Sequence, residues 1–320
     1  MQINPTTQVL FKSSLTSEYL AEELEYRKIR VLKQTDKMAV IENPENHPVY
    51  WADSVWSDCR SYAFKSISEA VKQVLTLKKQ QLVKKIIFSS VLHHRRTQLI
   101  ASDLKLFSLG EIDFNYHFYE PDNMLGFFLM DENTLICSSR ITPWQNICNF
   151  KFPENKKAPS RAFNKLWEGY SFYKKIENPA VTALDFGSSP GGWTWVLAQQ
   201  LKRTIAVDKA PLDPSLKGPS FFAIESIKQD AFTIDPREFI KKYDSKEFPI
   251  DWLLSDMICY PDKLYDFVLN WQENSNIRNY IFTLKFKGKT DFKVIDKYRK
   301  IPGIEIAHLR SNKHELTCFI

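Results

Sequence analysis

Short apolar runs and longer amphipathic stretches alternate along the second half of this 320-residue chain. The apolar runs predict β-strands, because strands buried on both faces read as continuous hydrophobic segments. These strands are predicted over residues 181–186, 204–208, 220–225, 250–256 and 279–285. The stretches between and around them predict helices over residues 162–175, 192–201, 236–243, 261–272 and 291–300. Strands that alternate with helices predict a doubly wound α/β domain around a mainly parallel sheet.

The last segment of the chain departs from this alternation. Two short strands are predicted over 303–309 and 315–320, and between them lies mainly the polar turn Arg310-Ser311-Asn312-Lys313. A crossover between parallel strands needs about a dozen residues. We therefore expect an antiparallel hairpin at the end of the chain.

The first half mixes strand and helix signals without regular alternation, which predicts a smaller α+β domain. Strands are predicted over 8–11, 29–32, 38–41, 85–88, 126–130 and 134–139, and helices over 17–26 and 67–82. The segment 149–159 carries two prolines among polar and charged residues, and it predicts an exposed connection. The chain is also longer than one typical domain. We predict one domain over residues 1–148 and a second over 149–320.

Composition places the chain among globular proteins, with 43% hydrophobic and 26% charged residues. No run approaches the roughly 18 apolar residues that suggest a membrane span, and no basic region followed by an apolar stretch opens the sequence. We therefore expect a cytoplasmic protein without a membrane partner. The five cysteines are scattered without a C-x-x-C pair, and no H-x-x-x-H occurs, so neither a disulfide framework nor a metal site is predicted. The sequence does not indicate an oligomeric state.

The net charge of +6 is unevenly distributed. Residues 1–150 hold 17 basic and 17 acidic residues, so the surplus lies in 151–320. Between Glu69 and Asp103 no acidic residue occurs, and the basic residues there are Lys72, Lys78, Lys79, Lys84, Lys85, Arg95 and Arg96. Such a stretch is suited to contact nucleic-acid phosphates. A solvated helix face gives the same pattern, and both interpretations stay open.

The most specific motif is the run LDFGSSPGGW at 184–193. Three of the nine glycines of the chain, Gly187, Gly191 and Gly192, fall within six positions there. Glycine permits the tight turn and close backbone approach that a junction of strand and helix needs. The free amides at the start of the helix then face the crevice where α/β proteins bind ligands. We expect a small adenosine-bearing cofactor in this crevice.

The residues of the turn favour one class of cofactor. A dinucleotide site would show G-x-G-x-x-G, whereas this turn reads G-x-x-P-G-G, and Pro190 lacks the amide that a phosphate would use. Asp185, just before the turn, suits a cationic ligand such as the amino group of S-adenosylmethionine. Asp208 ends the next strand and is placed to accept hydrogen bonds from ribose hydroxyls. S-adenosylmethionine is therefore favoured over NAD, and an NAD-dependent oxidoreductase is the alternative from another class.

Ionisable residues mark the ends of the predicted strands. Asp256 closes one strand, Lys285 closes the next, and Glu315 begins the last strand. A lysine at the end of a buried strand is unusual, because burying its charge is costly without a partner. Lys165 lies in the helix before the first strand of this half. Each residue alone is compatible with a helix cap or a surface pair, but we expect all four to flank one crevice.

These residues carry a family resemblance. SRAFNKL at 160–166, LDFGSSPGGW, SDM at 255–257, Lys285 and RSNKHE at 310–315 together resemble FtsJ-like RNA 2′-O-ribose methyltransferases. The resemblance covers 151–320 and implies a class I, Rossmann-like methyltransferase fold, for which an antiparallel terminal hairpin is typical. It also implies the catalytic Lys-Asp-Lys-Glu tetrad of that family, at Lys165, Asp256, Lys285 and Glu315.

Finer features look closer to the bacterial branch that methylates a cytidine of 23S ribosomal RNA. KFP at 151–153 is followed by APSR at 158–161, and SDM is followed by a helix with a Pro-x-Lys start. That branch carries an N-terminal RNA-binding region with a THUMP-like part. Residues 1–148 resemble it in shortened form, around 9–24 and 126–144. The implied partner is RNA, and ribosomal RNA in particular.

The resemblance also implies how the cofactor and the substrate are handled. S-adenosylmethionine would be contacted by Ser160, Gly187, Ser189, Pro190, Gly191, Gly192, Trp193, Asp208, Asp230 and Asp256. Asp230 matches the residue that contacts the adenine amino group, although a loop carboxylate or a helix cap is the alternative for it. Lys285 would be the base that removes the proton of the ribose 2′-hydroxyl. Two alternatives remain: a non-catalytic RNA-binding protein that keeps a methyltransferase fold, and a ribose methyltransferase that acts on another RNA.

Overall fold

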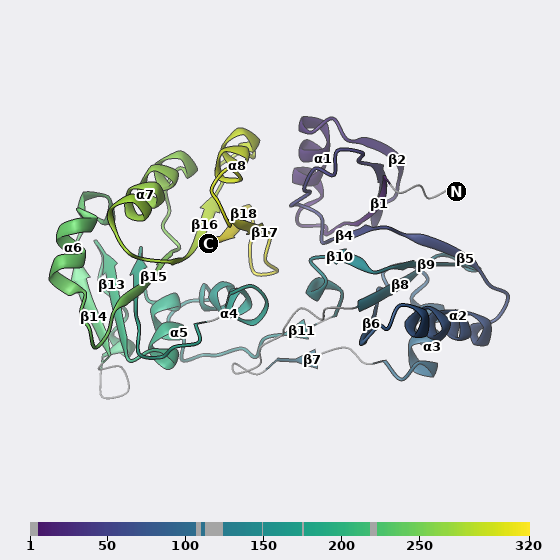
Figure 1. The fold of residues 1–320 in the computed structure, drawn as a ribbon, viewed down its shortest axis with the longest axis horizontal. Coiled ribbons are helices and arrows are strands. Elements are labelled where there is room, and N and C mark those ends of the chain that lie inside the picture. Colours follow the sequence, from purple (N-terminus) through teal and green to yellow (C-terminus); the bar gives the residue numbers. More distant parts are fainter. Residues whose placement is uncertain (1–5, 107–109, 113–123, 149, 175, 218–222) are drawn as a thin grey trace. The chain divides into compact units, whose positions relative to one another are not determined.

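Figure 1 shows the computed structural model, which describes residues 6–106, 110–112, 124–148, 150–174, 176–217 and 223–320. The chain forms two compact units, and the boundary between them in the sequence falls between Pro153 and Glu154. This boundary lies inside the connection predicted at 149–159. Within the described residues, no helix is both long and apolar enough to cross a membrane.

The described part of unit 1 combines β-sheets with three α-helices. Its strands are β1 (Thr7–Phe11), β2 (Arg30–Gln34), β3 (Met38–Glu42), β4 (Ser54–Ser57), β5 (Arg60–Ala63), β6 (Lys85–Phe88), β7 (Gly110–Glu111), β8 (Met124–Asp131), β9 (Thr134–Ser138), β10 (Arg140–Thr142) and β11 (Phe150–Lys151). Its helices are α1 (Ser17–Tyr26), α2 (Ile67–Gln80) and α3 (His94–Asp103). One sheet has the order β10-β4-β1-β3-β2 and is antiparallel. A second has the order β5-β9-β8-β6, in which β6 and β8 run parallel, and β7 pairs with β11.

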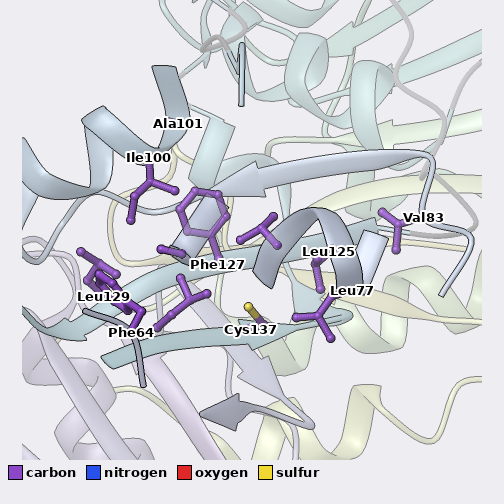
Figure 2. Close-up of a cluster of buried hydrophobic side chains, with 12 residues drawn as sticks. Phe64, Leu77, Val83, Ile100, Ala101, Leu125, Phe127, Leu129 and Cys137 are labelled. Carbon is purple, nitrogen blue, oxygen red and sulfur yellow. The ribbon is translucent and has the colours of Figure 1, made fainter. Parts of the chain in front are cut away.

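Helix α2 shows how the sequence builds the core beside the second sheet. The Ser66 side chain accepts a hydrogen bond from the Glu69 amide at 3.2 Å and so satisfies one of the free amides at the start of the helix. One face of α2 then packs with α3 over an apolar cluster, part of which is labelled in Figure 2. The cluster consists of Phe64, Ala70, Val74, Leu77, Val83, Ile100, Ala101, Leu125, Phe127, Leu129, Leu135 and Cys137.

The sequence pattern did not predict β4, β5, α3 and β10. Strand β5 is mostly exposed and lacks apolar alternation, so nothing in its sequence marks a strand. Helix α3 begins after His93, which has a left-handed backbone and makes no capping hydrogen bond through its side chain. These elements are stabilised by contacts with distant segments of unit 1, which a local pattern does not reveal.

Gly126 in β8 allows a close approach between strands of unit 1. A Cβ at this position would lie 2.8 Å from the Trp56 ring of β4 and still closer to Ile141 Cδ1 of β10. We expect Gly126→Ala to lower the free energy of unfolding by ~1–3 kcal/mol through overpacking. Denaturant unfolding measures the change, and Ile141→Val in the same chain should recover part of it. An unchanged midpoint for Gly126→Ala would contradict this packing.

Unit 2 is built on a seven-stranded sheet. Its strands are β12 (Thr182–Phe186), β13 (Arg203–Asp208), β14 (Ile224–Lys228), β15 (Ile250–Ser255), β16 (Asn279–Lys285), β17 (Glu305–Ala307) and β18 (Glu315–Phe319). Its helices are α4 (Phe163–Phe172), α5 (Gly192–Gln200), α6 (Pro236–Tyr243), α7 (Pro261–Asn274) and α8 (Phe292–Tyr298). The strand order is β14-β13-β12-β15-β16-β18-β17. This is the doubly wound α/β architecture predicted for the second half.

The pairing directions position the site. Strands β12 to β16 run parallel, whereas β18 is antiparallel to both β16 and β17. Helix α5 packs with α4, and α7 packs with α6 and α8, so helices lie on both faces of the sheet (Figure 1). The central residues of the strands, such as Leu184, Leu253 and Ile281, are fully buried. The strand order reverses between β12 and β15, which makes the carboxyl ends of these strands a topological switch point.

Some elements of unit 2 differ from their predicted bounds. The strand predicted over 220–225 is β14 at Ile224–Lys228, and residues 218–222 lie outside the described chain. β14 is an edge strand and only partly buried, so its apolar pattern is weak and the prediction began too early. The helix predicted over 162–175 ends at Phe172, and the strand predicted over 303–309 shortens to Glu305–Ala307.

Candidate functional site

The carboxyl ends of the parallel strands in unit 2 line a cavity of about 370 Å³. Wall residues come from the ends of β12, β13, β15 and β16 and from the segment before α4. The cavity therefore lies at the switch point of the sheet, where the connections leave toward opposite faces and open a crevice. It is the expected place for a ligand of this fold.

The glycine turn after β12 brings the backbone close to the strand-end loop of β15. Gly187 has a positive φ of +76°, which side chains rarely adopt. Its amide donates to the Val207 carbonyl at 2.9 Å. A Cβ on Gly187 would lie 2.9 Å from Met257 Cα and even closer to Met257 Cγ. Only glycine fits here, and its absent side chain leaves bare backbone at the cavity wall.

Nine of the ten residues predicted to contact a cofactor line this cavity. They are Ser160, Gly187, Ser189, Pro190, Gly192, Trp193, Asp208, Asp230 and Asp256. The exception is Gly191, which is not part of the wall. Its φ is +119°, and a Cβ there would meet Leu216 of the neighbouring segment rather than the cavity. The contact of Gly191 with a cofactor therefore stays a prediction, and its missing side chain lets α5 begin against Leu216.

Polar groups of the cavity leave room for a ligand. Ser160 Oγ is buried and makes no hydrogen bond within the described structure. A Cβ on Gly192 would collide with this hydroxyl, so glycine keeps the space beside it open. Trp193 Nε1 donates to the Ala162 carbonyl at 2.9 Å and so ties the start of α5 to the segment that carries Ser160. An unpartnered hydroxyl beside bare backbone fits a ligand with polar atoms.

Two carboxylates at the strand ends are held in place by backbone amides. Asp208 accepts from the Ser189 amide at 3.0 Å and from the Ala210 amide at 2.8 Å. Asp230 accepts from the Phe232 amide at 3.0 Å, and this hydrogen bond is the main reason why the pKa of Asp230 lies below its usual value. Carboxylate oxygens can accept further hydrogen bonds. Both side chains are therefore oriented acceptors at the cavity wall.

A third carboxyl group, Asp185, lies deeper in the wall. Its side chain is 1% exposed and accepts from Thr194 Oγ1 at 2.5 Å. Burial, with smaller contributions from the nearby Asp256 and Asp208, raises the pKa of Asp185 to about 7 despite the opposing Thr194 hydrogen bond. A positive charge in the cavity would favour the ionised form. This carboxyl group therefore suits a cationic ligand.

The four residues predicted as a tetrad come together at one side of the cavity. Lys165 Nζ lies 2.7 Å from Glu315 Oε1 and 3.2 Å from Asp256 Oδ1, and Lys285 Nζ lies 3.0 Å from the same Asp256 oxygen. Lys285 Nζ also donates to the Asp256 backbone carbonyl. The four side chains are between 10% and 21% exposed. Attraction between charges is stronger in such a partly buried place than in water.

The pairing of β16 with β18 brings two of these residues face to face. Lys285 and Glu315 are direct partners in the antiparallel register of the two strands. Asp256 follows β15, the neighbour of β16 on its other side, and Lys165 comes from α4. Three strands and one helix therefore supply the cluster, and each contributes the residue that the sequence singled out.

The sequence reasoning missed Glu168, a buried carboxyl group next to this cluster. Glu168 lies on α4 and accepts from the Arg310 amide at 2.9 Å, the Ser311 amide at 3.4 Å and the Ser311 hydroxyl at 3.3 Å. It thus ties α4 to the turn that leads into Glu315. The available signal was its spacing, because residues three apart on a helix share a face and Lys165 precedes Glu168 by three.

Glu168 gives the stability of unit 2 a dependence on pH. Burial raises the pKa of Glu168 to about 7, against an ordinary value of 4.5. The folded state therefore holds a proton that the unfolded chain releases, and the free energy of unfolding falls as pH rises from about 4.5 to 7. The expected loss from Glu168 is on the order of 3 kcal/mol. Asp185 adds a loss of the same sign.

Unfolding by denaturant at pH 5, 6, 7 and 8 measures this dependence. In Glu168→Gln the side chain is neutral in both states, so the fall between pH 5 and 7 should be smaller than in the unsubstituted chain. A slope that Glu168→Gln leaves unchanged would mean that Glu168 is ionised throughout this range.

The described residues outside this cavity offer no group arranged to hold a metal and no activated thiol. No three or more His, Cys, Asp or Glu side chains of that part of the chain are arranged to hold a metal ion. Cys59 and Cys137 are buried free thiols, and burial raises the pKa of each to about 12. Thiols with so high a pKa are unreactive near neutral pH. The strand-end cavity is the candidate site.

A comparison with known protein families gives a match within unit 2. The sequence model of the FtsJ-like methyltransferases matches residues 158–301, and the resemblance stated from the motifs is thereby confirmed. The matched range holds the glycine turn, Lys165, Asp256 and Lys285, and it ends before Glu315.

Curated relatives extend the comparison. The ribosomal RNA large subunit methyltransferase M of Methylococcus capsulatus is 29% identical over 180 residues, which are 55% of this chain and 45% of that protein. The protein of the same name from Teredinibacter turnerae is 31% identical over 173 residues, 52% of this chain and 45% of that protein. The chain spans about half the length of the curated relatives it matches. Among solved structures, the Methanococcus jannaschii fibrillarin pre-rRNA processing protein has a TM-score of 0.39 at 14% identity, over 62% of this chain and 81% of that one. A score this low supports no conclusion.

Proposed function

We propose that this chain, whose residues 158–301 match the model of the FtsJ-like methyltransferase family, transfers a methyl group from S-adenosylmethionine to a ribose 2′-hydroxyl of RNA. The observation that carries the proposal is the contact of Lys165 and Lys285 with Asp256, at the wall of a cavity suited to the cofactor. The names of the curated relatives support large-subunit ribosomal RNA as the substrate, which is 23S RNA in bacteria.

The cofactor is assigned to the strand-end cavity. S-adenosylmethionine, when bound, supplies a methyl group on a positively charged sulfur. The glycine turn and Ser160 would hold its methionine part. Asp185 would pair with the positively charged amino group of that part. Asp208 would accept from the ribose hydroxyls, and Asp230 from the adenine amino group. The unpartnered Ser160 hydroxyl and the oriented carboxylates support this assignment.

Lys285 is the proposed base of the reaction. Its Nζ takes the proton of the 2′-hydroxyl while the hydroxyl oxygen forms its bond to the methyl carbon and the bond from that carbon to sulfur breaks. Fully ionised, the two lysines balance Asp256 and Glu315, so the sulfonium adds one uncompensated positive charge. The reaction requires the Lys285 amine in its neutral form. Asp256 holds both amines in place, and Glu315 fixes Lys165.

RNA binding is assigned in part to the N-terminal domain, residues 1–148, which we propose is a shortened THUMP-like module working with a catalytic domain over 149–320. Two basic side chains of its acid-free stretch face rings of unit 1, with Lys85 over Trp144 and Arg96 over Phe64. The other five are exposed: Lys72, Lys78, Lys79, Lys84 and Arg95. Exposed lysines and arginines without nearby acids suit RNA phosphates. The proposed location is the cytoplasm, where ribosomal RNA is modified.

Methylation of unmodified 23S RNA tests the proposal. The purified chain is incubated with S-adenosylmethionine and either an in vitro transcript or precursor ribosomal particles from a strain that lacks the gene. Mass spectrometry should then locate a 2′-O-methyl group at one nucleotide. Calorimetry should show binding of S-adenosylmethionine and not of NAD. Binding of NAD would favour the oxidoreductase. Binding of RNA without methylation of either substrate would favour the non-catalytic alternative.

A further inference from the structure

Two large apolar side chains stand in solvent beside the proposed catalytic residues. Ile258 is 93% exposed and Tyr260 is 71% exposed, and Ile258 lines the same cavity as Asp256 and Lys285. Both follow Asp256 by no more than four residues. Isolated exposed apolar residues are common on protein surfaces. Two of them on the loop between β15 and α7, beside the proposed catalytic residues, suggest that this loop contacts a partner.

The loop that presents them is anchored on both sides. Met257, next to Ile258, is buried, and its amide donates to Ser255 Oγ at 3.4 Å. On the other side, the Tyr260 carbonyl accepts from the Leu264 amide in the first turn of α7. The Pro261 carbonyl accepts from the Tyr298 hydroxyl at 2.8 Å. The fold thus fixes the backbone of the loop without using the side chains of Ile258 and Tyr260.

Positive charge follows the other strand ends. Lys287 and Lys289 are exposed on the loop after Lys285, and Lys313 is exposed on the turn before Glu315. The two segments are joined, because the Phe286 amide donates to the His314 carbonyl at 3.1 Å and Thr290 Oγ1 lies 2.9 Å from His314 Nε2. The strand ends that carry the catalytic residues therefore continue into an apolar loop and a basic rim.

We propose that Ile258 and Tyr260 form a stacking platform for a base of the acceptor RNA strand, while the basic rim of Lys287, Lys289 and Lys313 contacts its phosphates. This inference rests on the proposed function and names the substrate contacts of the same site. Aromatic side chains beside lysines are the combination that binds unpaired nucleic acid. A base held on this platform would lie beside the cavity that contains Lys285, because Ile258 lines the same wall.

Substitutions of Tyr260 test the platform. Stacking contributes about 1–3 kcal/mol per base, which corresponds to roughly 5- to 150-fold in binding. We expect Tyr260→Ala and Tyr260→Leu to lower kcat/KM for the 23S transcript within that range, because leucine is apolar but has no ring face. Tyr260→Phe should stay close to the unsubstituted chain. The Kd of S-adenosylmethionine, measured by calorimetry, should stay unchanged in all three variants.

Further variants separate the platform from general effects. Glu238→Ala removes a side chain that is 73% exposed on α6, the helix that follows the edge strand β14 of unit 2, and it should leave kcat/KM unchanged. Lys287→Ala with Lys289→Ala should reduce the slope of log Kd for RNA against log salt by about 1–2, from the loss of two phosphate contacts. If Tyr260→Ala stays within about twofold of an active unsubstituted chain, the platform is refuted and the proposed function stands. If the unsubstituted chain methylates no RNA, the proposed function itself fails.

Discussion

Lys285→Ala is expected to lower the rate of methyl transfer by about 10²- to 10⁴-fold, the usual contribution of a positioned base. Alanine removes the amine that β16 contributes to the cluster. The 2′-hydroxyl would then lack its proposed proton acceptor. Single-turnover transfer of labelled methyl to the 23S transcript measures the rate. Calorimetry on the same variant should give a Kd for S-adenosylmethionine within a few-fold of the unsubstituted chain.

Two further lysine variants sharpen this experiment. Lys285→Arg keeps a positive charge, but a guanidinium does not give up its proton in proteins, so activity should not return. Lys241→Ala removes a lysine that is 78% exposed on α6, at the other edge of the sheet, and should leave the rate unchanged. A Lys285→Ala variant that transfers methyl at the native rate would show that another group takes the proton.

Gly187→Ala is expected to abolish cofactor binding at concentrations that saturate the unsubstituted chain. A left-handed backbone costs an alanine roughly 1–2 kcal/mol. The added Cβ would also meet Met257, including its backbone Cα at 2.9 Å, and a backbone atom moves only if the loop moves. Both the glycine turn and the loop that carries Asp256 should therefore shift. Calorimetry with S-adenosylmethionine and thermal unfolding measure the two consequences.

Gly303→Ala is the matched control for Gly187→Ala. Gly303 has nearly the same backbone, with φ at +77°, but a Cβ there would have no heavy atom within 4 Å. The control therefore carries the backbone strain without the collision. It should lower the melting temperature slightly and leave cofactor binding intact. Equal losses of binding in both variants would show that strain anywhere in unit 2, rather than the close approach at the turn, disrupts the cavity.

The sequence predicted the sheet of unit 2 and the tetrad because both leave local signals. Strands buried on two faces have continuous apolar sequences. A charged residue at the end of such a run marks where the strand ends, as Asp256 and Lys285 do. The carboxyl ends of parallel strands lie at one edge of a sheet. Residues from separate runs could therefore be assigned to one crevice before the fold was known.

What the sequence could not provide depends on contacts between distant segments. Glu168 and Arg310 are 142 residues apart, and nothing local to α4 shows that a turn near the end of the chain donates to its carboxylate. Gly191 carries the same sequence signal as Gly187, and only the packing shows that its missing side chain makes room for Leu216. Strand β5 is mostly exposed and becomes a strand through its pairing with β9.

The antiparallel register between β16 and β18 decides whether the cluster of four ionisable residues is complete. Side chains alternate along a strand, so a slip of one residue would turn the Glu315 carboxylate to the opposite face and leave Lys165 with Asp256 alone. The glycine turn and the carboxylates of β12 and β13 do not depend on that pairing. The glycine turn and these carboxylates thus need only the parallel strands, whereas the proposed proton abstraction also needs the final strand in register.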